Sequence, residues 1–301
     1  MATVEEIIFV GTGTSSSVPV ISCLTSPKRD CKVCLSTLTP EGRKNIRKNT
    51  SLLVRFRKHA DPPGARLRNV LIDCGKTFQS SAIEIFPRYG VRELDGVIIT
   101  HGHADACFGL DDLRGWTLGG AIQPYIDIHL SPESMDVISR TFPFLVDSAL
   151  ATGGGQVADF KFHVFDPEKP FTIHGLDFIP LAAHHGIYQT TQEPYLCYGF
   201  KFDDISYISD TNLIPLKTME IMKDKTKVFI VDCLRRKHSF KNMAPCEAYT
   251  ALQPAALYMF SGYTASFAFY SGRVNRSSEN CQRFIKDVLC WIYTSCRSSR
   301  L

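Results

Sequence analysis

Short apolar runs, each ending in a polar or glycine-rich stretch, recur along the first 240 residues of the chain. Ile7–Val10 and Val97–Ile99 are continuous apolar runs typical of buried strands, whereas Thr50–Lys58 alternates from its middle onward, as a half-exposed strand does. Further strands are predicted over Asn69–Asp73, Tyr125–Leu130, Phe178–Gly186, Tyr198–Phe202, Ile205–Ser209 and Val228–Cys233. Helices are predicted over Ser80–Arg88 and after Ser131, where serine caps and Pro132 takes the first position. The chain is therefore of mixed α/β type.

The densest polar cluster follows the apolar run at Val97–Ile99. Thr100 is followed at once by His101, His103 and Asp105. Strand ends of α/β proteins hold loop residues rigidly, so two imidazoles and a carboxylate at this spacing can converge on one or two metal ions. Imidazole suits zinc, iron or nickel, and the carboxylate suits a harder ion or a second metal. A solvated turn that contains two histidines is the alternative.

The motif Thr-His-x-His-x-Asp after a hydrophobic strand resembles the metallo-β-lactamase superfamily. Its continuation Gly-Leu-Asp-Asp-Leu-Arg, Gly109–Arg114, is most similar to the PhnP-like phosphodiesterase branch. The resemblance covers Ile7 to His238 and implies an αββα sandwich, with metals at the edge where the strands end. We expect one such domain over residues 1–240. Residues 241–301 form a divergent C-terminal segment, for which poor order, alternative splicing, a shifted reading frame and real divergence are all open.

Two further positions match the superfamily. His185 precedes a glycine at the end of a strand, beside His184, and Asp210 stands in a Ser-Asp-Thr context. The resemblance implies that one or two Zn²⁺ ions bind here, with Mn²⁺ or Fe as alternatives. Its implied first-metal ligands are His101, His103 and His185, with Asp210 bridging and Asp105 holding the second metal or orienting the nucleophile. Three histidines and a water make the open arrangement of a catalytic zinc. A turn or cap role is the alternative for Asp210.

The chain departs from the superfamily pattern at two ligand positions. Ala106 stands where the pattern has a histidine, and no histidine occurs after His238. Whether one or two metals bind therefore stays open, and Asp111 or Asp112 is a substitute ligand by proximity alone. Asp73, in an Asp-x-Gly context at the end of a strand, is expected to support the metal ligands, with a helix cap as the alternative.

Cys23, Cys31 and Cys34 form a second candidate metal site. Cys-x-x-Cys lets two thiolates share one zinc ion, and a third thiolate would complete most of a tetrahedral site. PhnP-like proteins hold a structural zinc with such a cluster and a distant histidine; simple reduced thiols are the alternative. Eleven cysteines behind an acidic start that resembles neither a secretory nor a transit peptide predict a reducing compartment, the cytoplasm with the nucleus as a further option.

Charge and glycine content point to an anionic substrate. Lys28–Arg68 holds twelve Lys and Arg against three acidic residues, which favours an anion, although a solvated basic face explains the charge equally well. The small residues of the first loop, Gly11, Thr12, Gly13 and Ser15, are expected to bind phosphate through backbone amides. Ala248–Gly272 lacks charge but is diluted by polar residues, so a buried or poorly defined segment rather than a membrane span is expected.

These features predict a metal-dependent hydrolase. By resemblance the substrate is a small cyclic phosphate or a nucleotide-like phosphodiester. The expected partner is thus a small phosphorylated molecule; nucleic acid is not favoured, no membrane partner is expected and a homodimer is open. A thioester or lactone hydrolase on the same scaffold is one alternative. A non-catalytic, metal-poor relative or isoform is the other, motivated by Ala106 and the missing terminal histidine.

Overall fold

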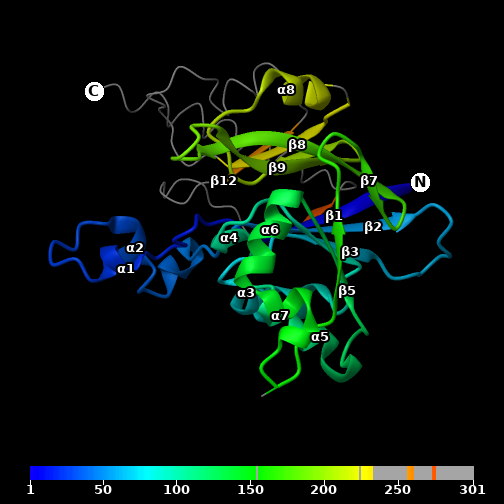
Figure 1. Cartoon of the computed structure of the whole chain (residues 1–301). Coiled ribbons are helices and arrows are strands. Elements are labelled where there is room, and N and C mark those ends of the chain that lie inside the picture. The colour runs from blue at the N-terminus through cyan, green and yellow to red at the C-terminus, as the bar shows by residue number, and fades with distance from the viewer. Residues whose placement is uncertain (154, 224, 233–255, 261–272, 276–301) are drawn as a thin grey trace.

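Two β-sheets pack face to face, and helices cover their outer sides (Figure 1). The computed structural model describes residues 1–153, 155–223, 225–232, 256–260 and 273–275. A seven-stranded sheet has the order β13-β1-β2-β3-β4-β5-β6, and a six-stranded sheet has the order β12-β11-β10-β9-β8-β7. The arrangement is the predicted αββα sandwich.

The strands of the first sheet are β1 (Ala2–Gly11), β2 (Ser51–Lys58), β3 (Arg68–Ile72), β4 (Gly96–Ile99), β5 (Ile126–Leu130), β6 (Phe160–Val164) and β13 (Arg273–Asn275). Those of the second are β7 (Phe171–Ile173), β8 (Leu176–Ile187), β9 (Pro194–Phe202), β10 (Ile205–Ile208), β11 (Val228–Asp232) and β12 (Ala256–Phe260). The α-helices are α1 (Ile21–Leu24), α2 (Lys32–Ser36), α3 (Phe78–Tyr89), α4 (Ala104–Cys107), α5 (Arg114–Thr117), α6 (Pro132–Thr141), α7 (Pro143–Val146) and α8 (Leu216–Lys223). Short 3-10 turns are η1 (Glu41–Asn45), η2 (Asp111–Leu113), η3 (Leu118–Gly120) and η4 (Ser148–Leu150).

Continuous apolar runs form strands that are buried on both faces. In β1, Ile7 and Phe9 join the core between the sheets, whereas Ile8 and Val10 join the core beneath α3 and α6. Successive side chains of a strand point to opposite faces, so an uninterrupted apolar run is what such a position requires. The helix predicted after Ser131 is also confirmed, because the Ser131 hydroxyl accepts a hydrogen bond from the Ser134 amide at 3.2 Å.

The predicted half exposure of Thr50–Lys58 is wrong for most of the strand. β2 lies between β1 and β3 inside the sheet, and Arg55 is only 8% exposed. Its guanidinium pairs with Glu6 at 2.5 Å and donates to the Asn69 side chain at 3.0 Å. Local alternation cannot reveal a cation that is buried against partners from neighbouring strands.

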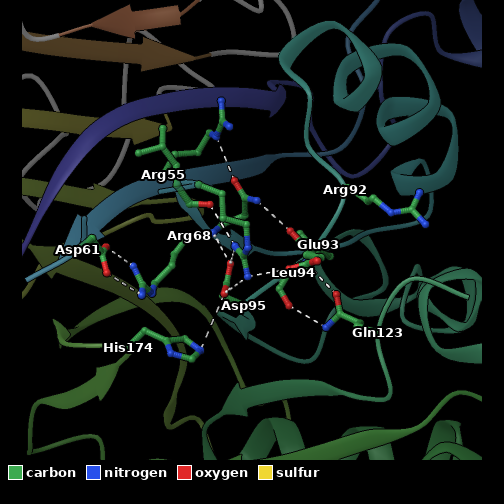
Figure 2. Close-up of polar contacts among 12 residues, drawn as sticks. Arg55, Asp61, Arg68, Arg92, Glu93, Leu94, Asp95, Gln123 and His174 are labelled. Atoms are coloured by element: carbon green, nitrogen blue, oxygen red, sulfur yellow. Dashed lines mark hydrogen bonds and ion pairs between the residues drawn. The ribbon is translucent and has the colours of Figure 1, made fainter. Parts of the chain in front are cut away.

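A network of hydrogen bonds and ion pairs around Asp95 connects the amino ends of β3 and β4. Both terminal nitrogens of Arg66 donate to the Asp95 carboxylate, at 2.7 and 2.8 Å, and the Asn69 amide donates at 2.8 Å. Figure 2 shows Asp95 at the centre of these contacts, with His174 on its other side. The loops that carry the candidate metal ligands lie at the opposite edge, where β3 and β4 end.

Two short strands from the C-terminal segment 241–301 belong to the sandwich. β12 pairs in parallel with β11, and β13 pairs antiparallel with β1. β12 lies within the uncharged stretch Ala248–Gly272. Apolar residues recur at helical spacing over Cys281–Ile292, which predicts an amphipathic helix, but this stretch falls outside the described residues. In the described part of the chain, no helix combines the length and apolarity that crossing a membrane requires.

His129 is half-buried between aromatic rings on the inner face of the first sheet. Its ring stacks on His163, with centroids 4.7 Å apart, and on Phe171 at 5.4 Å. Burial, followed by the charge of His163, lowers the pKa of His129 from 6.5 to about 4. Between pH 6.5 and about 4, the unfolded chain therefore binds a proton at His129 that the folded chain does not bind. The free energy of unfolding decreases as the pH is lowered through this range.

Replacing His129 with Phe keeps the stacking and removes this titration. We expect the difference in unfolding free energy between the variant and the wild type to move in the variant's favour between pH 6.5 and 4, by at most about 1.4 kcal/mol per pH unit. Urea unfolding at pH 7.5, 6 and 5 measures this difference. His59→Gln, at an exposed position, should follow the wild type, and parallel curves for His129→Phe would contradict the assignment.

Candidate metal centre

Three imidazoles from two sheets meet at the edge where the strands end. His101 and His103 lie in the loop between β4 and α4, and His185 lies near the end of β8. Their ring centroids are 4.7, 5.1 and 5.0 Å apart, and one nitrogen of each lies within 4.8 Å of the others. The structure therefore brings together the three histidines that the sequence singled out as first-metal ligands.

A β-bulge aims His185 at this cluster. The pairing of β8 with β9 shifts between His184 and Gly186, which leaves His185 as the extra residue. Bulges re-aim a side chain at a sheet edge. The backbone of His184 also accepts the Asn212 amide at 2.7 Å, and its own amide donates to the Leu213 carbonyl at 2.9 Å. The same bulge thus holds the loop that carries Asp210.

His101 is oriented by a buried chain of hydrogen bonds. The Thr100 amide and hydroxyl donate to the two oxygens of Asp73, at 2.9 and 2.8 Å. Because that proton is committed to Asp73, the Thr100 oxygen accepts at 2.9 Å from Nδ1 of His101. The proton of the imidazole then sits on Nδ1, and Nε2 carries the free lone pair. The expected supporting role of Asp73 has this physical basis, and the N-cap position of α3 is taken by Thr77 rather than by Asp73.

The histidines are held in the neutral form that binds metals. Burial lowers the pKa of His101 far below its usual range, with His185 and His103 adding to the effect. Burial also lowers the pKa of His103 and of His185. His101 is 2% exposed, and its Nε2 has no hydrogen-bond partner among the described residues. A buried lone pair without a donor, facing two further imidazoles, fits a divalent metal ion.

Asp210 lies beside the histidines, directly after β10. Its Oδ2 is 3.7 Å from Nε2 of His101. Burial, followed by the charge of Asp105, raises the pKa of Asp210 to about 7. A cation between the imidazoles and this carboxylate would stabilise the ionised form of Asp210 and offset the cost of burying its charge. Asp105 lies in the first turn of α4 and acts on the cluster through its charge, which raises the pKa of His103 and His185 against the effect of burial.

The residues expected near a second metal ion are positioned less favourably for metal binding than the three histidines. Ala106 is 2% exposed and offers no ligand atom. Asp111 lies 4.0 Å from Arg114, and the Gln79 amide donates to Asp112, so both carboxylates have partners in α5 and α3. In the part of the chain that the structure describes, the three histidines and the three cysteines are the groups with metal-binding spacing. Binding of metal by Asp105 and Asp210 stays a prediction.

Sequence reasoning missed two residues that position the ligands. The Tyr195 ring stacks on His103, with centroids 4.7 Å apart at 11°, and its hydroxyl accepts from the Gly102 amide at 3.3 Å. The Cys197 sulfur lies 3.6 Å from Nδ1 of His101. Both come from β9, the strand paired with β8. Only that strand pairing reveals them, since neither residue lies in a motif.

Cys23, Cys31 and Cys34 converge as the sequence predicted. Their sulfur atoms lie within 4.8 Å of one another at the starts of α1 and α2. The Cys34 amide donates toward Cys31, which precedes α2, and lowers the pKa of that thiol toward the thiolate form that binds metals. The structural zinc itself stays a prediction.

The glycines of the first loop serve close packing of the backbone. A Cβ at Gly11 would lie 1.9 Å from the Asn49 carbonyl oxygen, and one at Gly13 would lie 2.8 Å from that of Lys48. The Gly13 amide already donates to the Lys48 carbonyl at 2.6 Å. Phosphate binding through the Gly13 amide is therefore unsupported here, while Thr12 and Ser15 stay predictions.

Comparison with known proteins agrees with this geometry. The model of the beta-lactamase superfamily domain matches residues 68–266. The chain belongs to this superfamily. Among solved structures it is similar to a diphosphatase from the PhnP family, with a TM-score of 0.66 and 22% identity over 88% of this chain and 89% of the other. A long form RNase Z from yeast gives a TM-score of 0.56 and 14% identity, over 91% of this chain and 39% of the other.

One curated relative differs in its described chemistry. This chain is 29% identical over 233 residues to an octanoyltransferase from Porphyromonas gingivalis. The match covers 76% of this chain, whereas the chain spans 39% of the length of that relative. The structural similarities, all at low identity, define the fold.

Asp73→Asn is expected to weaken metal binding at the histidines. The new amide group would donate to Thr100, so that Thr100 donates to Nδ1 of His101 and the imidazole proton moves to Nε2. We expect a loss of about 10–100-fold in metal affinity, measured by competition with a chromophoric chelator. Asparagine tolerates the left-handed backbone of residue 73, φ 65°, so the fold should persist.

Asp61→Asn is the matched control, because Asp61 pairs with Arg68 at the other end of β3. It should leave metal affinity unchanged. Equal affinity of wild type and Asp73→Asn would refute the proposed direction of the hydrogen-bond chain.

Cys31→Ser is expected to lower the zinc content by about one ion per chain without changing the metal held by the histidines. His101→Ala should do the reverse, since the two clusters share no residue. Elemental mass spectrometry of the purified proteins measures both contents. Unchanged zinc in Cys31→Ser would rule out a cysteine zinc site.

Proposed function

We propose that the protein is a metal-dependent hydrolase that cleaves a small phosphodiester. The observation that carries the proposal is the convergence of three neutral imidazoles, with the buried Nε2 of His101 facing Asp210. A divalent metal, when bound, supplies Lewis-acid activation and a hydrolytic nucleophile near neutral pH. His101, His103 and His185 would hold it.

The other residues orient and balance this centre. Asp73 and Thr100 keep the proton of His101 on Nδ1, and Tyr195 keeps the His103 ring in place by stacking. Asp210, 3.7 Å from Nε2 of His101, is placed to accept a proton at its carboxylate from the attacking water. Asp105 adds negative charge to the same pocket of the site, which favours occupation by a cation.

Phosphoryl chemistry is supported by similarity and by charge. The PhnP-family diphosphatase and the RNase Z, both similar in fold, are named for cleavage of phosphate-containing substrates. The basic segment Lys28–Arg68 belongs to this same chain and favours an anionic substrate. Fold similarity alone does not fix a substrate, so the proposal depends on a direct assay.

Acyl-ester or thioester hydrolysis is the second candidate. It is favoured by the similarity to the Porphyromonas gingivalis octanoyltransferase, an enzyme named for acyl transfer. Because the chain spans 39% of that protein, its named activity belongs to the relative. The same metal arrangement activates water for attack on either a phosphorus or a carbonyl centre.

One preparation assayed with a p-nitrophenyl phosphodiester and with an octanoyl thioester separates the two candidates. We expect phosphodiester hydrolysis, reduced by more than about a hundredfold in His101→Ala. His59→Ala, at an exposed position, is the matched control and should keep full activity. Turnover of the thioester alone would favour acyl chemistry. Activity that survives in His101→Ala would refute the metal mechanism for either substrate.

A further inference from the structure

A basic cavity of about 700 Å³ lies at the end of β1, between the N-terminal basic segment and α3. Its charged lining consists of Arg43, Lys44, Arg47, Lys48, Arg88 and Glu84. Figure 1 shows α1 and α2 extending from the side of the sandwich. The lining includes residues between Arg43 and Lys48, the segment that leads from this extension back to β2. None of the histidines or carboxylates of the candidate metal centre lines it.

The charges in this cavity are strongly unbalanced. Five cationic side chains face one carboxylate, and that carboxylate is shared, since Glu84 lies 3.1 Å from Lys48 and 3.5 Å from Arg88. Like charges held close together in a partly enclosed space repel one another and raise the local positive potential. An anion with more than one negative charge would offset this repulsion.

The part of the cavity wall formed by Arg47 and Lys48 is held in place before any ligand binds. Arg47 forms a two-way backbone bridge with Val18, at 2.8 and 2.9 Å, and the Lys48 carbonyl accepts the Gly13 amide. The Lys48 side chain donates to the Ser80 carbonyl of α3 at 2.6 Å. Because the Lys48 side chain is already ordered, it loses little conformational entropy when an anion binds.

The remaining lining is of mixed polarity. Four apolar residues lie beside the cationic ones, Phe9, Val10, Ile46 and Ile85, and the others are Gly11, Thr12 and Thr37. Ile46 is 44% exposed, whereas Val10 and Ile85 are buried. The volume falls in the range of small-molecule sites, about 300–1,000 Å³, and exceeds what a lone phosphate would fill.

We propose that this cavity binds a nucleoside diphosphate, with its phosphates against the arginine and lysine side chains and its nucleoside against the apolar residues. The proposal goes beyond the hydrolytic function, because it concerns a second site whose lining is separate from the metal ligands. Arginine recognises phosphate oxygens by paired hydrogen bonds, and three of the five cations that line the cavity are arginines.

Calorimetric titration of the metal-loaded protein with ADP tests the proposal. We expect saturable binding, weakened by about tenfold in Arg43→Gln and in Arg88→Gln. Arg140→Gln is the matched control, because Arg140 forms an i,i+4 ion pair on α6 as Arg88 does with Glu84 on α3. Its affinity for ADP should equal that of the wild type.

His101→Ala separates the cavity from the metal centre. ADP should bind it as tightly as the wild type, even where hydrolysis is lost; a loss of binding would place ADP at the histidines and overturn the proposal. Equal affinity in Arg43→Gln, Arg88→Gln and the wild type would also overturn it. Pyrophosphate should bind more weakly than ADP, and equal affinities would contradict the nucleoside part.

Discussion

The hydrogen bonds from Thr100 to Asp73 join two adjacent parallel strands at the point where both end, and the metal centre depends on them. The Asp73 carboxyl is buried, and burial raises its pKa while the Thr100 donors act in the opposite direction. A buried carboxyl without donors is costly, so the register of β3 against β4 and the placement of Thr100 support each other. The free Nε2 of His101 follows from this pairing.

The second sheet completes the site, so the packing between the sheets is a functional constraint. His185, Asp210 and Tyr195 come from β8, the loop after β10, and β9. These strands are held against the first sheet by a dry aromatic core that includes Phe178, Phe200 and Tyr207. Close packing of large rings leaves little freedom for the sheets to slide. The distance between the histidine loop and the bulge at His185 is thereby set by side chains far from the chemistry.

Local patterns predicted the strands and the pair His101 and His103, and the resemblance to the superfamily added His185, but neither predicted the contacts between these elements. The continuous apolar runs of β1 and β4 predict buried strands by themselves. The spacing of His101 and His103 does not depend on where β4 is predicted to end. The burial of Arg55 depends on Glu6 and Asn69, which approach only through strand pairing. Tyr195 is equally non-local, because its contact with His103 spans two sheets. Long-range pairing, rather than propensity, accounts for what the sequence did not predict.

The contacts beneath α4 explain why the departure at Ala106 leaves the first metal site intact. The turn that carries Asp105 packs against the segment after β3 through backbone groups: the Cys74 amide donates to the Ala106 carbonyl at 2.8 Å, and the Gly109 amide donates to the Cys74 carbonyl at 2.7 Å. A Cβ at Gly75 would lie 1.8 Å from the Asp105 carbonyl oxygen, so the approach requires glycine. None of these contacts uses the side chain at 106. A ligand can therefore be absent there while Asp105 and the three histidines keep their positions.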